Sequence, residues 1–277
     1  MATIKLTDKL DHPLVSSLHF LDNAKLVING YAAKDWQSLP TEYESLVALG
    51  AREGRLLLAK PVGESVEIYV KSDANSRMLD SVSSYSFSWG GGFIGSAIYY
   101  LVTSDGLLLR EIDGDSGERL IINCPPTLRV SSSQDRLVFV DGQELTHFVI
   151  KRNPLRHSDE WVCSLDFDVS FVLVRDNVVA ILGRDGQFAF LRAGIGKINR
   201  GAAAGLNGVC LTAIFLNQSQ VRTFWASGWI VDFHVDSHEG LKIDVQHGLC
   251  FRAALSGDGG RIALWDGSHV FEYDIYA

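Results

Sequence analysis

Three residues with metal-binding side chains alternate along one predicted strand. Asp232, His234 and Asp236 are each two positions apart, so in an extended strand all three side chains point to the same side. Carboxylate and imidazole groups are ligands for divalent metals. Residues two apart on one strand rarely converge on a single ion without a second segment, so we expect the solvated side of an outer strand here and retain the three residues only as weak metal candidates.

Two other patterns could carry chemistry. The segment Gly90-Gly91-Gly92-Phe93-Ile94-Gly95 matches the G-x-G-x-x-G form of a dinucleotide loop, but that loop must open a helix. Residues 96–102 are instead aromatic and β-prone, which favours a glycine-rich connector. The chain contains no G-x-S-x-G nucleophile motif. We therefore predict no catalytic residue, no enzyme activity and no cofactor.

The four cysteines, Cys124, Cys163, Cys210 and Cys250, are widely separated. None of them has zinc-ligand spacing, and Cys210 and Cys250 are expected to pack as small apolar core residues. The first eight residues lack the apolar core of an export signal. Free thiols in a reducing compartment are therefore expected, with a cytoplasmic or nuclear location.

Composition narrows the classes of partner. Of the 277 residues, 47% are hydrophobic and 21% charged, which is typical of a packed globular protein. The net charge of −8 gives no electrostatic footprint for direct nucleic-acid contact. No apolar run reaches the ~18 residues that a membrane-spanning helix needs. A protein partner is the remaining expectation.

The elements that carry these residues recur along the chain. Gly208-Val209-Cys210 aligns without a gap with Gly248-Leu249-Cys250, 40 residues later, and Trp225 aligns with Trp265. Turn dipeptides with glycine in second place recur every 36 to 44 residues, and each is flanked by apolar β-prone runs; they begin at Asp105, Asp141, Asp185, Ser227 and Asp266. Glycine accepts positive φ and Asp bonds its own backbone, so this dipeptide suits a two-residue hairpin.

A period near 40 residues predicts the blades of a β-propeller. We expect an all-β, seven-bladed single domain over residues 1–277. The N-terminal strand at residues 3–7 should close the last blade and remove an exposed sheet edge. The predicted blades span roughly residues 9–40, 41–83, 84–123, 124–161, 162–204, 205–246, and 247–277 together with 2–8. Two polar or glycine-rich stretches, 152–161 and 194–208, are expected to be connectors.

Ser256-Gly257-Asp258-Gly259 and Leu264-Trp265-Asp266 carry a resemblance to the WD-repeat family. The resemblance implies a propeller that serves as a binding platform. The Trp-Asp pair occurs once, and the Gly-His pair of that family is absent. Residues 178–188 and 100–106 are also similar to the repeat of the regulator-of-chromosome-condensation propellers, which is the second choice and would imply a regulator of a GTPase or of chromatin.

The leading functional hypothesis is a non-catalytic scaffold within a protein complex. In WD-like propellers, the turns between second and third strands lie on a face that binds partners, and aromatic residues with arginine are typical of binding hot spots. The candidates near these turns are Trp225, Trp229, Trp265, His269 and Arg184. Trp225 and Trp265 could instead be buried between blades, which leaves Trp229 as the best surface candidate. The alternative is an enzyme or ligand binder that uses the central channel, where groups distant in sequence could converge.

Overall fold

The structure is a computed structural model. It describes strands and turns, and the described residues include no helix, hence none long and apolar enough to cross a membrane. The described residues are 3–11, 15, 17–21, 25–29, 31–32, 46–72, 75–113, 119–125, 129–152, 154–192, 198–237, 240–245 and 247–276.

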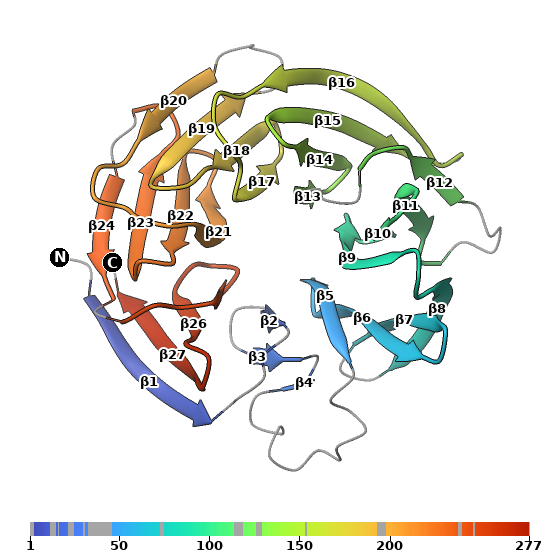
Figure 1. Ribbon diagram of the computed structural model, residues 1–277, viewed down its shortest axis with the longest axis horizontal. Helices are drawn as coiled ribbons and strands as arrows, with labels where there is room; N and C mark the ends of the chain where they lie inside the picture. Colours follow the sequence, from blue (N-terminus) through green and yellow to red (C-terminus); the bar gives the residue numbers. More distant parts are fainter. Residues whose placement is uncertain are drawn as a thin grey trace.

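Six four-stranded antiparallel sheets follow one another around a central axis (Figure 1). Within each, neighbours in the sheet are neighbours in the chain, except where the last sheet takes its fourth strand from the N-terminus. The strands are β5 (Val47–Arg52), β6 (Arg55–Val62), β7 (Ser65–Lys71) and β8 (Ser76–Ser83); β9 (Phe87–Ile94), β10 (Ile98–Thr103), β11 (Gly106–Glu111) and β12 (Arg119–Ile122); β13 (Arg129–Ser133), β14 (Arg136–Asp141), β15 (Glu144–Lys151) and β16 (Arg156–Ser164); β17 (Phe171–Arg175), β18 (Val178–Leu182), β19 (Gln187–Arg192) and β20 (Ile198–Ala202); β21 (Cys210–Asn217), β22 (Gln220–Trp225), β23 (Trp229–His234) and β24 (Gly240–Asp244); and β25 (Arg252–Leu255), β26 (Arg261–Trp265) and β27 (His269–Tyr276) with β1 (Thr3–Asp11).

A smaller sheet completes the ring between the first and last of these blades. It consists of β2 (Leu18–Leu21), β3 (Lys25–Ile28) and β4 (Tyr31–Ala32). Strand β2 contacts β25 on one side and β5 on the other. The chain is thus an all-β propeller with six four-stranded blades and one three-stranded sheet.

The N-terminal strand closes the last blade, as the sequence predicts. Strand β1 pairs antiparallel with β27, from Thr3 opposite Tyr276 to Asp11 opposite His269. It is longer than predicted, because pairing continues past residue 8. Closure of this kind covers a sheet edge that would otherwise offer unpaired backbone groups.

The sequence explains why the second strand of each blade is so apolar. It lies between two hydrogen-bonded neighbours, and both of its faces pack against adjacent blades. All five residues of β18 are buried, and Trp225, at the end of β22, has no exposed surface. Packing between blades forms the core: the Phe188 and Phe233 rings of neighbouring blades lie 4.8 Å apart. A strand buried on both faces is a continuous apolar run rather than an alternating one.

The recurring Asp-Gly dipeptides lie between second and third strands, and their glycines have a steric role. Gly106 has φ 120° and Gly186 has φ 82°. A Cβ atom on Gly106 would lie 2.1 Å from the Ile122 carbonyl oxygen, and one on Gly186 would lie 2.4 Å from that of Ala203. The turn therefore needs glycine both for its backbone conformation and for the close passage of the chain that leads to the next blade.

Three predicted connectors are strands. Strand β16 occupies most of 152–161 and passes the predicted blade boundary at 161, and β20 lies within 194–208. The glycine run is part of β9, where residues 91–94 pair with β10. These predictions were wrong because polar and glycine residues are typical of loops. Here the polar residues lie on outer strands that face solvent, and Gly90, Gly91 and Gly92 lie on an inner strand so close to β10 that a Cβ atom would not fit.

Candidate functional site

A cavity of about 580 Å³ lies on the propeller axis. It is lined by residues from all seven sheets. Arg129, Phe171, Cys210 and Arg252 are each the first residue of their inner strand and all lie in its wall. The inner strands therefore begin at one face, which we call the proximal face, and we call this space the proximal cavity.

The turns between second and third strands must lie on this same face, because successive strands of a blade are antiparallel. The connections between blades lie there too. A second cavity of about 510 Å³ continues along the axis and shares Leu18, His19 and Phe171 with the proximal cavity. Its wall includes Arg52 and Glu53, from the hairpin between the first two strands of a blade. Two cavities with different linings therefore follow each other along the axis.

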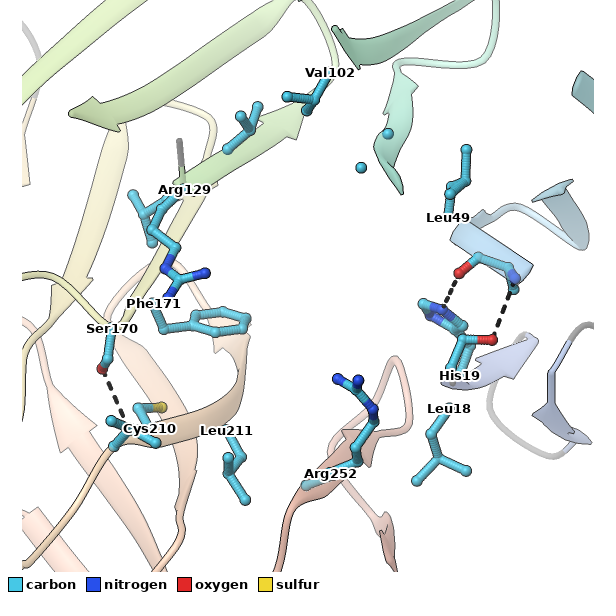
Figure 2. A pocket seen from close by; sticks show the side chains of 18 of the residues that line it. Leu18, His19, Leu49, Val102, Arg129, Ser170, Phe171, Cys210, Leu211 and Arg252 are labelled. Carbon is cyan, nitrogen blue, oxygen red and sulfur yellow. Dashed lines mark hydrogen bonds between the residues drawn. The ribbon is translucent and has the colours of Figure 1, made fainter. Parts of the chain in front are cut away.

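Two arginines supply the charge of the proximal cavity. Figure 2 shows the side chains of Arg129 and Arg252 reaching from different blades toward its middle. The Arg252 Nε donates a hydrogen bond to the Val15 carbonyl oxygen at 3.2 Å, which holds one side of that guanidinium. The described lining residues include no Asp or Glu. The cavity is thus locally positive in a chain of net charge −8.

The opposite wall is held by a small polar arrangement. The His19 Nε2 donates to the Ala48 carbonyl oxygen at 3.2 Å, and the Ala48 N–H donates to the Ser17 hydroxyl at 3.2 Å (Figure 2). Desolvation lowers the pKa of His19, and the hydrogen bond to Ala48 only partly opposes this shift. The imidazole is therefore neutral near pH 7, and the arginines alone carry the charge.

Glycines leave part of the wall without side chains. A Cβ atom on Gly91 would lie 2.8 Å from the Tyr100 carbonyl oxygen, and one on Gly90 would lie 2.9 Å from Val102 Cγ2. The run that formally resembles a nucleotide loop is thus an inner strand packed tightly on β10. It has no helix after it, so it lacks the geometry of a dinucleotide site.

The predicted partner residues separate into buried and accessible groups. Trp225 is fully buried, and its Nε1 donates to the Thr223 hydroxyl at 2.9 Å. The prediction that it contacts a partner is therefore wrong, because the second strand that carries it packs on both faces. Trp229 and Trp265 are half-buried beside the same turns, packed on core clusters.

The remaining two partner candidates also lie at the proximal face. Arg184 is exposed, and its backbone bridges to Val209. His269 lies with its Nε2 3.3 Å from an Asp11 carboxylate oxygen and its Nδ1 3.7 Å from one of Asp266. This histidine therefore contributes to the joint between the two ends of the chain.

The weak metal candidates bind arginines instead of converging. Asp232 forms a bidentate pair with Arg222, at 2.7 and 2.6 Å. Asp236 pairs with Arg192, at 3.3 and 2.9 Å, and His234 accepts the Asp236 N–H at 3.4 Å. In the described ranges, no three His, Cys, Asp or Glu side chains are grouped to hold a metal ion. Asp232 and His234 share one side of β23, as predicted, but Asp236 lies in the turn beyond its end, and neighbouring strands bring guanidinium groups to both aspartates.

The cysteines are free thiols. Cys210 and Cys250 are buried, as their matching positions in the repeat predict. Burial raises the pKa of both thiols, that of Cys250 to about 12 with Asp266 contributing. Neither thiol is activated as a nucleophile, because nucleophilic cysteines need the opposite shift.

Sequence reasoning missed Arg129 and Arg252. Their convergence depends on ring closure, which brings residues from two distant blades to one axis. One signal could have found them: both occupy the first position of an inner strand, so an alignment of the units at that position places them at the same level of the channel.

Comparisons with known proteins give the fold but no family. No protein-family model matches the chain, and no curated protein matches it. Among solved structures, the chain is similar to the computationally designed Ika8 protein, with a TM-score of 0.62 and 16% identity over 94% of this chain and 83% of that one. It is also similar to a chain in a crystal structure of the mitotic checkpoint complex, with a TM-score of 0.55 and 9% identity over 80% of this chain and 87% of that one. Likeness at such low identity supports the propeller fold, and function must be argued from the surface and the channel.

Proposed function

We propose that this protein is a non-catalytic interaction scaffold, a subunit of a protein complex that binds its partner at the proximal face. The observation that carries the proposal is the set of large apolar side chains left exposed there. Tyr85 is 82% exposed, Leu249 64%, Phe251 54% and Trp89 45%. Exposed apolar side chains gathered at one face are typical of an interaction surface.

The position of these residues supports the proposal further. Tyr85 lies in the connection from β8 to β9, and Leu249 and Phe251 lie in the connection from β24 to β25. Both connections lie at the proximal face, around the cavity mouth. Phe251 also contacts Trp265, with ring centroids 6.1 Å apart. Aromatic residues close to arginines, here Arg252, have the composition of a binding hot spot.

The same proposal extends to the number of blades, the type of repeat, the cellular location and the class of partner. We take the three-stranded sheet as a seventh blade and the repeats as degenerate relatives of the WD type. One similar fold occurs in the mitotic checkpoint complex, a multiprotein assembly, which is consistent with a scaffold. The four free thiols favour a reducing compartment, cytoplasm or nucleus. The acidic chain favours neither nucleic acid nor a membrane as a direct partner.

The test is affinity capture from extracts of the source cells with paired variants. The Tyr85→Ser/Leu249→Ser double variant removes two side chains of the proximal face. The matched control is Met78→Ser/Leu241→Ser, since these outer-strand residues are 52% and 56% exposed and lie away from the channel. Both variants should melt close to the wild type, because exposed substitutions cost little stability.

We expect wild type and control to retain one partner in stoichiometric amount, and the proximal-face variant to lose it at least tenfold. Equal retention by all three proteins, or equal loss from the control, would contradict the assignment of this face. Trp229→Ala is a poorer probe, because Trp229 packs on the core and its loss would also lower stability.

A further inference from the structure

The proximal cavity has the size and form of a small-molecule site. Its volume of about 580 Å³ lies within the range of about 300–1,000 Å³ for ligand pockets. Its lining comes from every sheet of the ring. A site built from ring-closed strands is held in place by the whole fold, so the backbone positions of its residues are fixed relative to one another.

The charge of the cavity is one-sided. The backbone of Arg129 pairs with β14, but its side chain makes no hydrogen bond or ion pair within the described part of the chain. Arg252 uses its Nε for the Val15 carbonyl, while its terminal nitrogens point into the cavity (Figure 2). Like charges facing one enclosed space repel one another, and the described residues of the wall offer no carboxylate to balance them. A bound anion would supply that balance.

The chemistry of guanidinium narrows the choice of anion. Its planar set of donors matches the two oxygens of a carboxylate or phosphate, and such charge-assisted bonds are about twice as strong as neutral ones. Guanidinium groups from two blades line the same cavity, so an anion inside it is attracted by both.

The rest of the wall indicates what the anion is attached to. Leu18, Val102, Phe171 and Leu211 contribute apolar surface, and Gly90 and Gly91 contribute bare backbone. The Phe171 ring projects into the cavity (Figure 2). An aromatic or aliphatic body would pack against this part of the wall and leave its charged end at the arginines.

We propose that the proximal cavity binds a small organic anion, a carboxylate or phosphate monoester with an apolar body, between Arg129 and Arg252. The site shares Phe251 and Arg252 with the proposed partner surface, whereas Tyr85 and Leu249 lie outside its lining, so substitutions at Tyr85 and Leu249 separate the two proposals.

Phenyl phosphate is the probe, with inorganic phosphate and phenol as its two halves, and binding is measured by calorimetry at low ionic strength. The variants are Arg129→Gln, Arg252→Gln and the double variant. The control is Arg119→Gln, which removes the same charge from an exposed position on the outer strand β12. Melting without ligand shows that each variant folds.

We expect saturable one-to-one binding of phenyl phosphate to the wild type and to Arg119→Gln. Each channel substitution should weaken binding about ten- to hundredfold, as expected for loss of a charge-assisted hydrogen bond. Added salt should weaken binding. Phenol should not bind, and inorganic phosphate should bind more weakly than phenyl phosphate.

Three results would overturn the proposal: no binding to the wild type at millimolar probe, an unchanged affinity in the double variant, or an equal loss in Arg119→Gln. A glutamate-rich peptide that bound through the same arginines while phenyl phosphate did not would also overturn it, in favour of a partner segment. The Leu249→Ser substitution should leave phenyl phosphate affinity unchanged, so this test and the partner test can fail separately.

Discussion

The Arg222 guanidinium combines a nearly buried ion pair with Asp232 inside one blade with a hydrogen bond to the next blade, so its loss is expected to destabilise the fold. Arg222 lies in β22 with its side chain 5% exposed, and Asp232 lies opposite in β23 at 15%. Two hydrogen bonds of 2.7 and 2.6 Å join them, and the third guanidinium nitrogen donates to the Gly259 carbonyl oxygen of the next blade at 2.6 Å. The same arginine therefore neutralises a buried carboxylate and ties neighbouring sheets together.

Replacing Arg222 by Ala should lower the free energy of unfolding by about 3–5 kcal/mol. That is the usual cost of breaking a buried pair, because the remaining carboxylate is left desolvated and unpaired. With an m-value of about 3 kcal/mol per molar urea, the unfolding midpoint should fall by about 1 to 1.7 M. Equilibrium urea unfolding followed by tryptophan fluorescence measures this shift.

A matched pair on the surface supplies the control. Arg192 and Asp236 also form a two-bond arginine–aspartate pair, but their side chains are 26% and 51% exposed. Arg192→Ala should cost about 0–1 kcal/mol. The Arg222→Met/Asp232→Leu variant should be more stable than Arg222→Ala alone, because it removes both charges together. Equal midpoints for Arg222→Ala and Arg192→Ala, or a double variant no more stable than Arg222→Ala, would refute the argument from buried charge.

Two further predictions concern the closure and the thiols. Deleting residues 1–11 should lower the urea midpoint and produce self-association in sedimentation velocity, because it uncovers the paired edge of β27. A monomer of unchanged stability would contradict the role of β1 in closing the ring. The control is Leu6→Thr, at a site 49% exposed, which should leave the stability nearly unchanged. In native protein at pH 8, a thiol reagent should modify Cys163 and Cys124 well before Cys210 and Cys250, because the latter pair is buried. All four should react in urea, and fast native labelling of Cys210 would show that the inner strand opens.

The repeat period predicted most of the fold because every blade packs between two neighbours in the same way and therefore needs the same pattern of residues. Its second strand is covered on both faces, as in β18, and therefore appears as an unbroken apolar run. Its turn between second and third strands needs a glycine such as Gly186, whose Cβ would collide with the passing chain. Outer strands such as β16 and β20 were missed for the converse reason: one edge and much of their surface face solvent, so polar residues there carry no strand signal.

The functional residues were harder to predict because burial and ring closure decide them. Trp225 and Trp265 align in the repeat, yet Trp225 is fully buried and Trp265 only partly. Within one strand, the sequence shows which side chains share a side, as for Asp232 and His234, but not which residue of the adjacent strand faces them. The sequence likewise does not show that Arg129 and Arg252, far apart in the chain, line the same cavity. Each looks like an ordinary exposed residue at the start of a strand, and only closing the circle of sheets brings both charges to one cavity, where together they favour an anion that neither would bind tightly alone.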